Sequence, residues 1–186
     1  MPIDRDHSAY IKQYQQHGLT VYSNADVASD FDGVVELEPM KKYHLVGFTV
    51  IPLRVPHGDY PNYAYHITLP DCQTLLFATD LERWNYNFNS ITHLAIECNY
   101  SDDIRIDAML NGAELRAQSR NHMEIGETIR TINRLKSPEL QTVVLLHLSQ
   151  GLSDAENFKR RIFNECGVKA EVADENKTFV LRKEEF

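Results

Sequence analysis

The sequence lacks the features that mark several classes of protein. Its three cysteines, Cys72, Cys98 and Cys166, are an odd number and have no CxxC spacing. We therefore predict free thiols in a reducing compartment, and neither a disulfide framework nor a thiolate zinc site. No apolar run approaches the roughly 18 residues of a membrane-spanning helix, and the N-terminus lacks the basic-then-apolar pattern of a signal peptide. These absences predict a soluble, cytoplasmic protein with no membrane partner.

Positive charge is also scarce. The 186 residues include 19 Lys and Arg against 27 Asp and Glu, a formal net charge of −8. This balance argues against a surface that binds nucleic acid along its whole length, although it leaves room for a local basic patch or a metal-mediated contact with phosphate. Hydrophobic residues make up 42% of the chain. Length and composition therefore predict one globular domain over residues 1–186 with a sizeable core.

The remaining pattern alternates strands with helices. Apolar, β-branched runs of strand length occur at 74–79, 92–96 and 142–149, and residues 63–79 have the pattern of a hairpin. Helical periodicity covers 122–135 and 153–166, and a second hairpin is predicted over 168–181. The order predicts an α/β fold with a mixed β-sheet and flanking helices.

Polar side chains that bind metals follow several of the predicted strands. His147 ends the apolar run 142–149, Asp80 follows the run 74–79, and His57 comes after another apolar run. Asp6 and His7 open the chain. Each of these residues alone is well explained as a helix cap or a turn. Because open α/β sheets place ligands at the carboxyl ends of their strands, Asp and His delivered to one rim predict a site for zinc or a related metal.

The order of these residues resembles the metallo-β-lactamase superfamily, and within it the phosphodiesterase branch that includes tRNase Z-like and exonuclease-like proteins. Asp6 and His7 before a helix are similar to the end of that family's His-x-His-x-Asp-His motif. His57, Asp80 in Ala-Thr-Asp, and His147 in Leu-His-Leu-Ser resemble its later metal ligands.

Two further residues extend the resemblance, which runs from about residue 3 to 182. Glu97 in Ile-Glu-Cys-Asn-Tyr resembles a Glu-containing strand end of that branch, and His122 in Asn-His-Met-Glu resembles a histidine ahead of a helix. The resemblance implies that Glu97 and His122 pass a proton to the leaving oxygen or orient ligating imidazoles.

The resemblance also implies a cofactor and an activity. One or two divalent ions, zinc or alternatively manganese, would be held by Asp6, His7, His57, Asp80 and His147, with Asp80 bridging the two. Asp6, Glu97 and His122 are the expected catalytic residues. The implied activity is hydrolysis of a phosphodiester in a nucleotide or nucleic acid, on a truncated αββα sandwich.

The sequence departs from the family pattern at its start. Counting back from Asp6 and His7, the first two motif histidines are replaced by Pro2 and Asp4, and the strands that precede the motif in the family are missing. Three explanations are consistent with this. The chain is a naturally short relative that binds one metal or none and acts as a nucleotide- or protein-binding module; it is completed by another chain, in a homo-oligomer or a complex; or it is a fragment of a longer enzyme.

Overall fold

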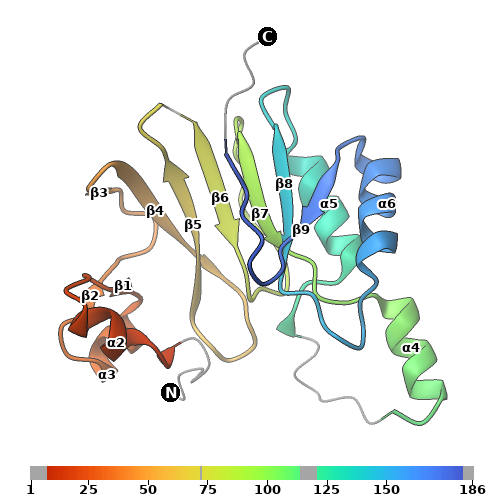
Figure 1. Cartoon of the computed structure of the whole chain (residues 1–186), viewed down its shortest axis with the longest axis horizontal. Coiled ribbons are helices and arrows are strands. Elements are labelled where there is room, and N and C mark those ends of the chain that lie inside the picture. The colour runs from red at the N-terminus through yellow and green to blue at the C-terminus, as the bar shows by residue number, and fades with distance from the viewer. Residues whose placement is uncertain (1–7, 72, 114–120, 182–186) are drawn as a thin grey trace.

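The structure, a computed structural model, describes residues 8–71, 73–113 and 121–181. Its main element is a seven-stranded sheet with the order β3-β4-β5-β6-β7-β8-β9 (Figure 1). The strands are β3 (Tyr43–Leu45), β4 (Phe48–Val55), β5 (Asn62–Thr68), β6 (Thr74–Ala78), β7 (His93–Glu97), β8 (Thr142–Leu146) and β9 (Ala170–Val172). The predicted α/β class with a mixed sheet is confirmed.

The strand directions place several chain segments at one edge of the sheet. Strands β3 to β6 pair antiparallel, whereas β6, β7, β8 and β9 pair parallel. Because β4 is two antiparallel steps from β6, it runs in the same direction as β6. The carboxyl ends of β4, β6, β7 and β8 therefore lie side by side along one end of the strands, which we call the carboxyl edge of the sheet. The residues that follow these strands meet there.

Two helices, α5 (Ile125–Leu135) and α6 (Ala155–Cys166), cover one face of the sheet. Helix α5 buries isoleucines at every third or fourth position, such as Ile125, Ile129 and Ile132, which is the spacing of one helical face. This face packs into a core that includes Ile96 of β7 and Leu145 of β8. Helix α4 (Asp102–Leu110) buries none of its residues and extends from the end of the molecule (Figure 1).

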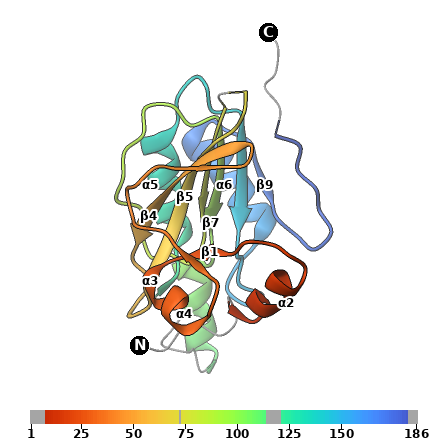
Figure 2. The ribbon, with the colours of Figure 1, turned by 90° about the vertical axis from the view of Figure 1, so that its left-hand side faces the viewer.

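The N-terminal segment lies beside β3, β4 and β5 (Figure 1), at the same end of the molecule as α4 (Figure 2). It contains α2 (Ile11–Gln16), α3 (Ala25–Asp30) and a small parallel pair of strands, β1 (Tyr22–Ser23) and β2 (Val35–Glu36). Asn24 caps α3 by accepting a hydrogen bond from the backbone N–H of Val27 at 3.0 Å. Among the described residues, no helix has both the length and the apolar character to cross a bilayer.

Most of the predicted elements are present. The hairpin predicted over 63–79 is formed by β5 and β6, which pair antiparallel. The hairpin predicted over 168–181 is wrong, because β9 pairs parallel with β8 and residues 178–181 form no strand. Helix α6 connects β8 to β9 and carries the chain back to the end of the sheet where β8 begins. Strand β9 therefore runs parallel to β8.

Candidate metal centre

The candidate site is assembled from the residues that follow neighbouring strands. Glu97 is the last residue of β7, Asp80 follows β6 after Thr79, His147 follows β8 directly, and His57 follows β4 after Pro56. His122 reaches the same edge from the segment before α5. Two backbone hydrogen bonds, Asn99 N–H to Met123 O and Ile125 N–H to Tyr100 O, both 2.9 Å, hold that segment beside the end of β7.

Four of these side chains form one cluster. Asp80, Glu97, His122 and His147 each offer one ligand atom, and these four atoms lie within 4.8 Å of one another. Nδ1 of His122 is 2.7 Å from Oε1 of Glu97, and Nδ1 of His147 is 2.9 Å from the same oxygen. Nδ1 of His147 is also 3.3 Å from Oδ1 of Asp80. Two carboxylates and two imidazoles at this spacing match the donor types of divalent transition-metal sites.

Glu97 is the centre of this cluster. Its side chain is completely buried, so its charge requires compensation within the protein. Oε2 accepts hydrogen bonds from the backbone N–H groups of Leu81 at 2.7 Å and Met123 at 3.4 Å, while Oε1 faces the two imidazoles. Both oxygens of Glu97 therefore already accept hydrogen bonds, and the carboxylate ties the loops after β6 and β8 to the segment before α5.

His57 lies next to the cluster but outside the four-atom group. Its ring is buried, and its centroid is 4.9 Å from that of His122, which is 4.8 Å from that of His147. Nδ1 of His57 is 3.0 Å from the carbonyl oxygen of Asn121, which can only accept. Nδ1 therefore carries the proton, and Nε2 is the ring nitrogen with a lone pair for a ligand.

The backbone is unusual at two of the candidate ligands. Asp80 and His147 both have a backbone φ of 56°, which lies in the left-handed region that residues other than glycine rarely adopt. An asparagine side chain donates a 2.7 Å hydrogen bond to the carbonyl oxygen of each residue, from Asn62 to Asp80 and from Asn99 to His147. These bonds stabilise a conformation that turns both side chains out of the strand direction and toward the cluster.

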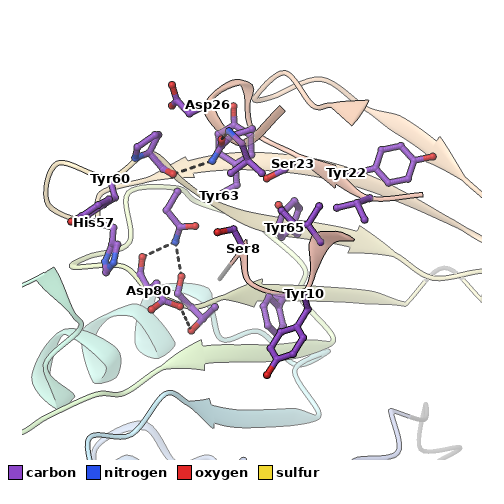
Figure 3. Close-up of a pocket in the computed structure, with 18 of the residues that line it drawn as sticks. Ser8, Tyr10, Tyr22, Ser23, Asp26, His57, Tyr60, Tyr63, Tyr65 and Asp80 are labelled. Carbon is purple, nitrogen blue, oxygen red and sulfur yellow. Dashed lines mark hydrogen bonds between the residues drawn. The ribbon is translucent and has the colours of Figure 1, made fainter. Parts of the chain in front are cut away.

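A cavity of about 510 Å³ opens beside His57 and Asp80. It lies between the N-terminal segment and strands β5 and β6, and Figure 3 shows His57 and Asp80 at one end and Tyr22 at the other. Cys98 follows Glu97 but adds no reactive group, because burial raises the pKa of its thiol to about 12. Cys98 and Cys166 are free thiols, as expected from the sequence.

The structure thus brings together five of the predicted site residues: His57, Asp80, Glu97, His122 and His147. Asp6 and His7, like Pro2, Asp4 and Cys72, lie outside the described residues. Sequence reasoning missed Asn62 and Asn99. Both stand at the ends of strands, as Asp80 and His147 do, but an asparagine there is typical of any turn, so its sequence position alone does not reveal its partner.

Comparison with known proteins places the fold. The structure of the metallo-β-lactamase fold protein YhfI from Bacillus subtilis matches with a TM-score of 0.69 and 20% identity, over 90% of this chain and 70% of that one. Igni18, described as a novel metallo hydrolase from Ignicoccus hospitalis, matches with a TM-score of 0.69 and 13% identity, over 95% and 75% of the two chains. A diphosphatase of the PhnP family matches with a TM-score of 0.58 and 15% identity, over 89% and 60%. The chain has the metallo-β-lactamase fold, as the resemblance in its sequence implied.

Comparison of sequences adds less. No family model matches the chain. A curated relative, an octanoyltransferase of Porphyromonas gingivalis, is 31% identical over 114 residues, which is 61% of this chain. The matched residues make up 20% of that protein, so the chain matches only about a fifth of its length.

Proposed function

We propose that the protein is a metal-dependent phosphodiesterase that acts on a nucleotide or nucleic acid. The observation that carries the proposal is the convergence of Asp80, Glu97, His122 and His147, with ligand atoms within 4.8 Å of one another, at the carboxyl edge of a metallo-β-lactamase fold. The fold similarity to a PhnP-family diphosphatase supports a phosphate ester as substrate. Open α/β sheets bind ligands at this same edge.

Asp80, His147 and His57 are the proposed ligands among the described residues, and Asp6 and His7 are proposed from the sequence. Zinc fits best, because imidazole nitrogen and carboxylate oxygen are its usual donors apart from thiolate, and manganese is the alternative. A divalent ion bound there would act as a Lewis acid toward a phosphoryl oxygen and activate a water molecule.

Glu97 is assigned a positioning role. By distance it belongs to the four-atom group, but both of its oxygens already accept hydrogen bonds from imidazole or backbone donors. A carboxylate that accepts from Nδ1–H of a histidine fixes the ring and directs its other nitrogen, Nε2, away from itself. Glu97 therefore orients His147 as a ligand.

His122 is assigned the role of proton donor. Its ring lies against the rings of both His57 and His147, and its side chain keeps 19% of its surface exposed, so a substrate can reach it. The Glu97 carboxylate, 2.7 Å from Nδ1 of His122, fixes the orientation of the ring that would deliver a proton to the leaving oxygen.

A second candidate is a nucleotide- or protein-binding module without hydrolytic activity. Pro2 favours it, because proline at a motif position offers no side-chain ligand. As a separate alternative to this inactive module, a second copy of the chain or a complementing chain would supply further metal ligands, and hydrolytic activity would then depend on protein concentration.

The experiment that separates these candidates combines metal content with hydrolysis. Elemental analysis of the purified protein should find one or two equivalents of zinc or manganese. Hydrolysis of bis-p-nitrophenyl phosphate should be lost in His147→Ala and kept in His44→Ala, which removes an exposed histidine on β3. Absence of metal, with folding and hydrolysis unaffected by a chelator, would overturn the proposal.

A further inference from the structure

The cavity beside the candidate metal centre has the size of a small-molecule site. Its volume of about 510 Å³ lies within the range of about 300–1,000 Å³ that is typical of ligand pockets. His57 and Asp80 form one end (Figure 3), and the other lining residues come from the N-terminal segment and from β5 and β6. A molecule that reacts at the metal centre would therefore place its non-reacting part in this cavity.

The cavity wall is aromatic. Six tyrosines line it, contributed by three separate segments of the chain: Tyr10, Tyr14, Tyr22, Tyr60, Tyr63 and Tyr65. Tyr63 is only 6% exposed, and burial raises the pKa of Tyr65, so the wall formed by β5 is largely dry. Tyr10, on the opposite wall, is 62% exposed. One aromatic wall is thus buried and the other is open to an entering ligand.

The charges of the cavity exclude a second anionic group. Its charged lining residues among the described part of the chain are the carboxylates Asp26 and Asp80, and none of the described lining residues is Lys or Arg. A nucleic-acid strand would place further phosphates in this space, where the Asp26 carboxylate repels them and no lysine or arginine among the described lining residues compensates their charge. A flat, uncharged ring system is not repelled by a carboxylate and requires no cation. It can also stack on the faces of the tyrosines.

We propose that the substrate is a small phosphodiester carrying one uncharged aromatic group of nucleobase size, which stacks in the tyrosine-lined cavity while the phosphate lies at His57 and Asp80. This inference rests on the proposed function, because it names the substrate class of the same site. It selects a single nucleotide ester over a nucleic-acid polymer.

Two probes with the same leaving group test the inference. The probes are the p-nitrophenyl ester of thymidine 5′-monophosphate and methyl p-nitrophenyl phosphate. In both reactions water adds to phosphorus, the bond from phosphorus to the nitrophenyl oxygen breaks, and p-nitrophenol leaves. The products are thymidine 5′-monophosphate and methyl phosphate, so the two probes differ only in the group that would enter the cavity. For the metal-loaded protein, kcat/KM should be at least tenfold higher for the thymidine ester.

Variants show whether the cavity causes this preference. Tyr65→Leu, on the buried wall, and Tyr10→Leu, on the exposed wall, should each lower the ratio of the two kcat/KM values about tenfold, the effect of losing one base-stacking contact. Phe163→Leu removes an exposed aromatic ring on α6 that does not line the cavity and should leave the ratio unchanged. Tyr10→Leu keeps the test valid if the buried substitution impairs folding.

Calorimetric titration with thymidine, which has no phosphate, separates this inference from the proposed function. Saturable binding that Tyr10→Leu weakens supports the cavity assignment even if neither ester is hydrolysed. Hydrolysis of both esters at similar kcat/KM, with a ratio that neither tyrosine variant changes and no binding of thymidine, overturns the cavity assignment and leaves the phosphodiesterase proposal standing.

Discussion

The side chain of Asn99 donates a 2.7 Å hydrogen bond to the carbonyl oxygen of His147, a residue held at φ of 56°. Asn62 makes the same bond to Asp80, which has the same φ. The two strand ends that carry the proposed ligands thus share one device, in which an asparagine from a neighbouring strand end stabilises a strained backbone. Strain held in this way pre-positions a ligand before any metal binds.

Asn99→Ala should therefore weaken the metal site as well as the fold. Loss of the hydrogen bond should lower the free energy of unfolding by about 1 kcal/mol, and metal affinity should fall about tenfold because His147 is no longer fixed. Urea unfolding and zinc titration measure the two effects. Asn111→Ala is the matched control, because Asn111 donates a similar bond to the carbonyl oxygen of Asp107 on exposed α4. Equal effects of both substitutions on zinc affinity would contradict the role assigned to Asn99.

Glu97→Gln tests the centre of the cluster with almost no change in shape. The amide keeps one acceptor oxygen but places a donor toward either the imidazoles or the backbone N–H groups of Leu81 and Met123. We expect a loss of about 1–3 kcal/mol in the free energy of unfolding and a fall of about 10–100-fold in zinc affinity. Glu139→Gln, at an exposed position, serves as the control. Unchanged zinc affinity in Glu97→Gln would show that this carboxylate does not position the histidines.

Gly58→Ala should disturb His57. A Cβ at Gly58 would overlap the side chain of Asn121, whose backbone carbonyl accepts the hydrogen bond from His57, and φ is +56° there. Strain of about 1–2 kcal/mol is expected from the backbone alone, and the clash adds to it. In Gly47→Ala the backbone strain is present without the clash, since φ is +87° and nothing lies within 4 Å. Thermal unfolding should therefore show a larger loss for Gly58→Ala, and an equal loss in the two variants would contradict the predicted clash.

The stability of the protein should fall in mild acid because of His93. This histidine is completely buried at the start of β7, its Nε2 donates to Oε1 of Gln73 at 2.8 Å, and burial lowers its pKa below 6.5. Below pH 6.5 the unfolded chain binds a proton that the folded protein does not, so the free energy of unfolding decreases as pH falls. His66, whose pKa is also lowered by burial, acts in the same direction.

His93→Gln removes one of these titrations. Glutamine can keep the hydrogen bond to Gln73 but cannot be protonated, so urea unfolding from about pH 7.5 to about pH 5 should show a shallower decline than in the parent protein. An identical decline in both proteins would show that His93 does not contribute.

The sequence predicts which residues lie close together at the candidate site better than it predicts the residues that support them. His57, Asp80 and His147 could be found because each follows an apolar run, and because strand direction in an α/β fold brings such ends together. The left-handed backbone of Asp80 and His147 has no counterpart in the sequence, since it is stabilised by Asn62 and Asn99, up to 48 residues away in the chain.

The prediction of a hairpin over 168–181 was wrong because strand pairing, too, depends on residues far away in the chain. The apolar residues of 178–181 have the composition of a strand, but β9 already pairs parallel with β8 at the edge of the sheet. Which edge a strand joins depends on tertiary packing rather than on local composition. The tyrosine cavity also escaped prediction, because its walls come from α2, β1 and β5, which no local pattern relates to one another.

The central claim is that Asp80 and His147 bind the catalytic ion, with Glu97 holding the histidines in place. Crystals of the protein grown with zinc, measured at the zinc absorption edge, test it directly. The account predicts an anomalous difference peak within bonding distance, about 2 Å, of both Asp80 and His147. A peak elsewhere on the protein, or none at saturating zinc, would contradict it.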